Sequence, residues 1–182
     1  EKYVPSHMFD EIDIIYVGQF EQLISRELEA LYESGGILIT NTLDNNLDFI
    51  ENIVHETAHS LEKAHGLQIY GDKKIEREFL GKRARLFYII NAEGYDTNTI
   101  DFSNLDFSAE MDYFLYRDIG YEKLNYLING LFLNSYAVTS LREYFSSGLE
   151  KYLLDGEGRR YLKVLSPQLV EKLEELINGY QH

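Results

Sequence analysis

The chain has 182 residues, of which 45% are hydrophobic and 26% charged, so we expect a single domain over residues 1–182 with a core of its own. Asp and Glu outnumber Lys and Arg by 31 to 17, and a formal net charge of −14 argues against nucleic acid and anionic membranes as partners and favours a cationic peptide. The lack of cysteine excludes disulfides and thiolate chemistry, and no apolar run approaches the roughly 20 residues of a membrane span.

The first third of the chain predicts two strands and a helix. Four of the six residues 12–17 are β-branched and the run precedes Gly18, which indicates a strand. Apolar residues recur at helical spacing over 20–31, and residues 37–40 predict a second short strand.

The rest of the chain predicts helices. The region 47–65 carries an apolar stripe of Ile50, Ile53, Val54, Thr57, Ala58 and Leu61, with Gly66 as its stop. A charged helix over 73–92 should turn inward Ile75, Phe79, Leu80, Ala84, Phe87 and Ile90, and a loop over 91–107 follows. Further helices are expected over 108–116, 121–132, 139–154 and 167–177. We therefore predict an α+β fold that is mostly helical, with a small mixed sheet near the N-terminal half.

The most informative motif is His-Glu-x-x-His at residues 55–59, which lies inside the helix predicted from periodicity. Four residues advance a helix by about 400° and 6 Å, so the rings of His55 and His59 stand one above the other and can bind one Zn²⁺. Glu56 lies about 100° around the helix, where it can serve as a base for a water on the metal. The plain alternative is a chance pair of surface histidines beside a common glutamate.

A catalytic zinc site of this kind needs a third protein ligand. Glu62 shares the helical face of the histidines but is better placed to hydrogen-bond a ligand imidazole. His65 completes the spacing of the metzincin proteases, which have glycine where this chain has Glu62. Glu143, on the helix predicted over 139–154, is the third candidate, although it also fits a capping box with Ser140. Glu150 is a weaker alternative.

Tyr136 precedes Glu143 by seven residues. A phenol near the metal could hydrogen-bond a developing oxyanion. In a chain with 15 tyrosines, packing is the alternative role for any one of them.

The pattern His-Glu-x-x-His followed by Tyr-x₆-Glu resembles the catalytic domain of anthrax lethal factor and the related secreted Pro-Pro endopeptidases. The similarity extends to residues 55–62 with Gly66, to Ser135-Tyr136 with residues 143–145, and to residues 162–164 with the closing helix. It covers roughly residues 37–66 and 134–178, whereas about 70–130 is a longer, mostly helical insertion that does not align.

This resemblance implies a zincin-like metalloprotease fold with one Zn²⁺ per chain. His55, His59 and Glu143 would be the metal ligands, Glu56 the base and Tyr136 the transition-state stabiliser. The expected activity is that of a zinc-dependent metalloendopeptidase acting on a peptide or protein, and only the resemblance suggests secretion or delivery to a target. The alternatives are a metzincin-like protease that uses His65, and an inactive zincin-like module of a toxin or phage particle.

Overall fold

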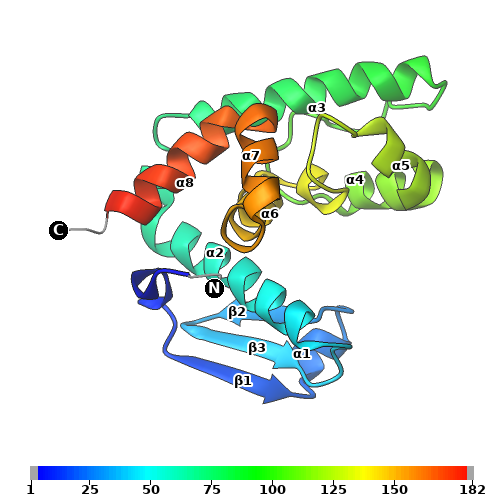
Figure 1. Cartoon of the computed structure of the whole chain (residues 1–182). Coiled ribbons are helices and arrows are strands. Elements are labelled where there is room, and N and C mark those ends of the chain that lie inside the picture. The colour runs from blue at the N-terminus through cyan, green and yellow to red at the C-terminus, as the bar shows by residue number, and fades with distance from the viewer. Residues whose placement is uncertain (1–3, 180–182) are drawn as a thin grey trace.

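The N-terminal part of the chain forms a three-stranded sheet of mixed direction (Figure 1). The structure is a computed structural model that describes residues 4–179. β1 (Ile14–Gly18) pairs in parallel with the central strand β3 (Gly36–Thr40), and β2 (Ala30–Glu33) pairs with β3 in the antiparallel direction. Both predicted strands and the small mixed sheet are confirmed.

The helix predicted over residues 20–31 is wrong. Only α1 (Glu21–Ile24) forms, and the chain leaves the helix through Glu27, whose φ is +54°. The following residues enter β2, which pairs with β3. Ser34 and Gly35 adopt φ of +52° and +84° and form the two-residue turn of the hairpin that joins the two strands. Pairing with β3 therefore overrides the local helical spacing.

Helices make up most of the remaining chain. They are η1 (Ser6–Phe9), α2 (Asn46–Tyr70), α3 (Lys74–Ala92), α4 (Ala109–Tyr113), η2 (Phe114–Ile119), α5 (Tyr121–Leu127), η3 (Tyr136–Val138), α6 (Leu141–Leu154), α7 (Gly156–Leu165) and α8 (Pro167–Gly179). The predicted helices and the loop before α4 are confirmed, apart from shifts at their ends and the shortening of 121–132. Helix α7 was not predicted. Asp155 caps α7 by accepting the N–H groups of Glu157 and Gly158.

Helix α2 runs from the sheet into the helical part of the molecule (Figure 1). Asn45 caps its first turn by accepting backbone N–H groups. Val54, Ala58 and Leu61 of the predicted stripe are buried, whereas Ile50 is 46% exposed because it lies toward the start of the helix. The backbone departs from helical geometry at His65, and the helix then continues to Tyr70.

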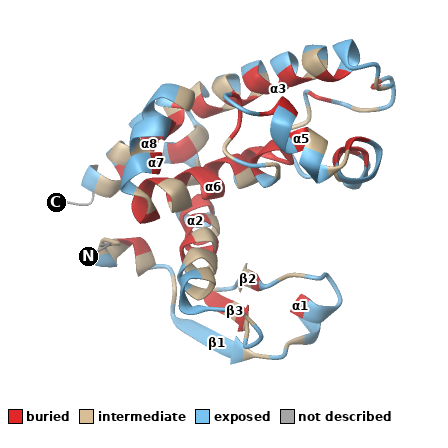
Figure 2. Ribbon diagram, turned by 45° about the vertical axis from the view of Figure 1, so that its right-hand side comes forward, coloured by how far each residue is buried: buried red, intermediate tan, exposed pale blue. Residues whose placement is uncertain are grey.

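Helix α3 turns most of the predicted face inward. Ile75, Phe79 and Ile90 are fully buried, and Leu80 and Phe87 pack against the core, but Ala84 is exposed. The buried face passes instead through the two cations Lys82 and Arg83. Figure 2 shows the alternation of buried and exposed residues along this helix. Among residues 4–179, no helix is both long and apolar enough to cross a membrane.

Candidate metal centre

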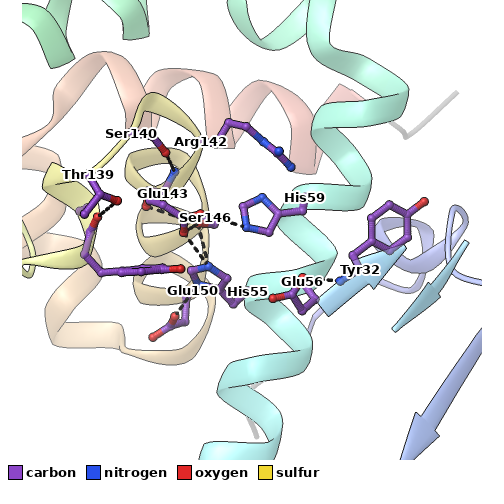
Figure 3. Close-up of polar contacts among 12 residues, drawn as sticks. Tyr32, His55, Glu56, His59, Thr139, Ser140, Arg142, Glu143, Ser146 and Glu150 are labelled. Atoms are coloured by element: carbon purple, nitrogen blue, oxygen red, sulfur yellow. Dashed lines mark hydrogen bonds and ion pairs between the residues drawn. The ribbon is translucent and has the colours of Figure 1, made fainter. Parts of the chain in front are cut away.

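Two helices bring together side chains of the kinds that bind metal ions. His55 and His59 project from successive turns of α2, and their ring centroids are 5.1 Å apart. Helix α6 packs against α2 and directs Glu143 at both rings (Figure 3). Residues separated by more than 80 positions in the sequence therefore meet at one point.

Glu143 does not complete the capping box with its side chain. The hydroxyl of Ser140 accepts the N–H of Glu143 at 3.1 Å, which is the first half of such a box. The carboxylate instead lies 3.0 Å from Nε2 of His55 and 3.6 Å from Nε2 of His59. The carboxylate of Glu143 is therefore available as a ligand, because the hydroxyl of Ser140 caps the start of the helix.

The three side chains fit a metal ion. Ligand atoms about 2.1 Å from a tetrahedral ion lie about 3.4 Å from one another, and the observed carboxylate–imidazole separations of 3.0 and 3.6 Å lie on either side of that value. His55, His59 and Glu143 each offer one ligand atom, and these three atoms lie within 4.8 Å of one another. The group could therefore hold a metal ion with little rearrangement.

The other ring nitrogen of each histidine faces a carboxylate. Nδ1 of His59 is 2.8 Å from Glu62, as the sequence predicted for a residue that orients a ligand. Nδ1 of His55 is 3.3 Å from Glu150, which therefore lies outside the ligand set and holds the ring from behind. Glu62 also accepts hydrogen bonds from the hydroxyl of Tyr70 and from Nε of Arg142. Such outer carboxylates fix the tautomer in which Nε2 is free to bind a metal.

These carboxylates control the protonation of His55. Burial lowers the pKa of this ring, but hydrogen bonds to Glu143 and Glu150 and the charges of Glu143 and Glu56 raise it more, to about 10. Burial favours the neutral form of Glu143, yet the two histidines keep its pKa below the usual range. Without a metal, the protonated ring of His55 and the ionised carboxylate of Glu143 therefore form an ion pair. A metal ion would take the place of the proton between them.

Glu56 points from α2 toward the sheet, away from Glu143 (Figure 3). Its carboxylate accepts the backbone N–H of Tyr32 in β2 at 2.6 Å. A cavity of about 190 Å³ is lined by Glu56 and by His55, His59 and Glu143. The carboxylate thus faces the same space as the three metal-ligand side chains without belonging to their group.

Tyr136 lies on the wall of this cavity, in η3 just before α6. Its ring centroid is 5.9 Å from that of His55. Burial, and then the negative charges of Glu143 and Glu56, raise the pKa of the phenol, which therefore stays protonated at neutral pH and can donate a hydrogen bond.

His65 is not part of the metal-ligand group found among residues 4–179. It lies at the kink near the end of α2, after the helix has advanced beyond His59. The structure thus brings together His55, His59 and Glu143, with Glu56 and Tyr136 beside them, and leaves His65 outside.

Comparison of the chain with protein-family models, with curated proteins and with solved structures found no match. The function must therefore be inferred from the site itself. Sequence reasoning missed the contacts of Tyr32 and Arg142, because each depends on an element that packs against α2 from far away in the sequence. It also missed the contact of Tyr70, which lies on α2 itself, eight residues after Glu62 and beyond the kink at His65.

Proposed function

We propose that this chain is a zinc metalloendopeptidase with a zincin-like fold, in which His55, His59 and Glu143 hold the ion. The observation that carries the proposal is that these three side chains and Glu56 line one cavity. The resemblance of the sequence motifs to the lethal factor and Pro-Pro endopeptidase family supports the same function.

The residues around the cavity supply the steps of peptide hydrolysis. His55, His59 and Glu143 would hold the Zn²⁺ ion, which would supply activation of a water molecule and polarisation of the scissile carbonyl group. Glu56 takes the proton of the attacking water and passes it to the leaving amine. The N–H of Tyr32 holds one oxygen of that carboxylate in place. The phenol of Tyr136 donates a hydrogen bond to the oxyanion that develops on the substrate.

The walls of the cleft favour an extended peptide with a basic side chain. β2 is an edge strand, and the N–H of Tyr32 on its unpaired side points at Glu56, so a peptide entering the cavity can lie along this edge. A second cavity of about 370 Å³, which also touches His55 and Glu56, is lined by Glu27, Glu29, Glu51 and Glu150. These carboxylates favour a cationic side chain, as does the net charge of the chain.

The function is tested by metal analysis and a peptide library. We expect one zinc per purified chain, and cleavage of library peptides that stops when a strong chelator removes the metal and returns when zinc is restored. Cleaved peptides should be enriched in Lys or Arg near the scissile bond. Cleavage that continues at full rate in the metal-free protein would contradict the proposal, as would a zinc-loaded protein that cleaves no peptide.

Metal binding should depend steeply on pH. Because the pKa of His55 is raised to about 10 in the metal-free protein, zinc must displace a proton from this ring throughout the neutral range. We therefore expect the apparent zinc affinity to rise about tenfold per pH unit from pH 7 to 8.5, where a histidine of ordinary pKa would already be neutral. Calorimetry in buffers of different ionisation enthalpy measures the released proton. A zinc affinity that is constant above pH 7 would contradict the raised pKa.

An inactive zinc-binding module is the second candidate function. The outer carboxylates Glu62 and Glu150 would serve a structural metal equally well. Glu56 favours the enzyme, because a purely structural site has no use for a carboxylate beside the ligands.

A further inference from the structure

Two neighbouring cations on α3 are buried without a carboxylate partner. Lys82 and Arg83 are 7% and 1% exposed, and neither forms an ion pair within residues 4–179. Burial lowers the pKa of Lys82 to about 8 and that of Arg83 to about 10, so both are mainly charged at neutral pH. A buried charge is costly unless it is fully hydrogen-bonded, so the groups that satisfy these cations are informative.

Arg83 is satisfied by backbone carbonyl groups. Its Nε and Nη2 donate to the carbonyl oxygens of Val138 and Thr139, at 2.9 and 2.7 Å, and its Nη1 donates to that of Asn104 at 3.1 Å. The planar guanidinium thus holds two consecutive carbonyl groups in one orientation. Both belong to the short turn that follows Tyr136.

Lys82 holds the other end of the same segment. Its ammonium donates to the carbonyl oxygen of Leu131 at 2.7 Å, and also to the carbonyl of Leu165 and the hydroxyl of Ser166. Residues 131–139 are therefore tied to α3 at both ends. This segment has only the three-residue helix η3 of its own, and it carries Tyr136.

We propose that Lys82 and Arg83 are positioning residues, which hold residues 131–139 so that the phenol of Tyr136 stays beside the metal centre. Arg83 has the larger part, because it binds the carbonyl groups of Val138 and Thr139, which lie between Tyr136 and Ser140, the N-cap of α6. This role rests on the peptidase function proposed above. It also means that α3 supports the metal centre, although this helix belongs to the insertion that the family resemblance does not cover.

A double-mutant cycle separates positioning from general stability. Arg83→Lys keeps a positive charge but loses the planar fork, and a small misplacement of a catalytic group lowers kcat by about tenfold or more. Tyr136→Phe should lower kcat by about 10²-fold with zinc content and KM unchanged. If Arg83 acts through Tyr136, Arg83→Lys should cost less than about twofold in the Tyr136→Phe background. Equal losses in both backgrounds would overturn the proposal.

Two further variants separate the positioning role from a general loss of stability. Lys172→Met is the matched control, since Lys172 is a buried lysine of α8 that pairs with Asp72 and Glu175, and it should leave kcat unchanged. Lys82→Met releases the other end of the segment and should also lower kcat only where Tyr136 is present.

Hydrogen exchange followed by mass spectrometry tests the clamp even if the chain cleaves no peptide. In Arg83→Lys, amides of residues 132–140 should exchange about tenfold faster, while those around His55 and His59 keep their rates. Unchanged exchange in 132–140 would overturn the positioning role whether or not the protein is a peptidase. Faster exchange in an inactive protein would uphold the clamp and count against the peptidase function alone.

Discussion

Glu56→Gln is expected to lower kcat by about 10²–10⁴-fold, the range of a lost general base, while zinc content and fold are retained. Glutamine has nearly the same shape and can still accept the N–H of Tyr32, but its amide cannot take a proton from water. Glu56→Ala should be equally inactive, because the decisive loss is the basic oxygen. The measurements are kcat on a cleaved library peptide and zinc per chain.

The pair of Glu56 variants separates chemistry from structure. An Ala variant that is inactive beside a Gln variant of nearly full activity would show that Glu56 acts only by bracing β2. Wild-type activity in both would remove Glu56 from the mechanism, and loss of zinc from both would make it a part of the metal site.

Glu143→Ala is expected to reduce zinc affinity by more than about 100-fold, which exceeds the effect of losing an outer hydrogen-bond partner. The helix start should survive, because Ser140 caps it through the backbone N–H of residue 143 and not through the side chain. His65→Ala should change zinc affinity by less than about twofold, since His65 lies outside the ligand group. Competition with a chromophoric chelator measures all of these affinities.

Glu150→Gln provides an intermediate case. Glu150 contacts Nδ1 of His55 and does not face the metal position, so we expect a loss of about 10- to 100-fold. We thus expect the loss of zinc affinity to be largest in Glu143→Ala, intermediate in Glu150→Gln and smallest in His65→Ala. Full zinc loss in His65→Ala with little change in Glu143→Ala would instead support the metzincin geometry.

The elements predicted best are those whose pattern is local. The helix that carries residues 55–59 repeats its apolar positions every three to four residues. Its predicted stop at Gly66 was wrong, because the backbone only kinks at His65 and the helix continues to Tyr70. The helix predicted over 20–31 shows the same kind of spacing, but only Glu21–Ile24 is helical, and residues 30 and 31 at its end pair with β3. Local periodicity cannot register a strand partner that lies elsewhere in the chain.

The burial of Arg83 on α3 was missed for a related reason. A four-residue step from Ile75 through Phe79 leads to Arg83, which sequence reasoning treats as a solvated charge. The carbonyl groups that make its burial possible belong to Asn104, Val138 and Thr139, and no pattern within α3 announces them.

The sequence by itself determined the half of the metal site that lies on one helix. Four residues of an α-helix fix the spacing of His55 and His59, and Glu62 follows one turn later by the same geometry. The family resemblance already implied Glu143, but the approach of its carboxylate to both histidines, the place of Glu150 behind His55 and the anchoring of Glu56 by Tyr32 were decided only by the tertiary structure. These contacts join α2 to α6 and β2, and their distances depend on how the helices and the sheet pack against one another.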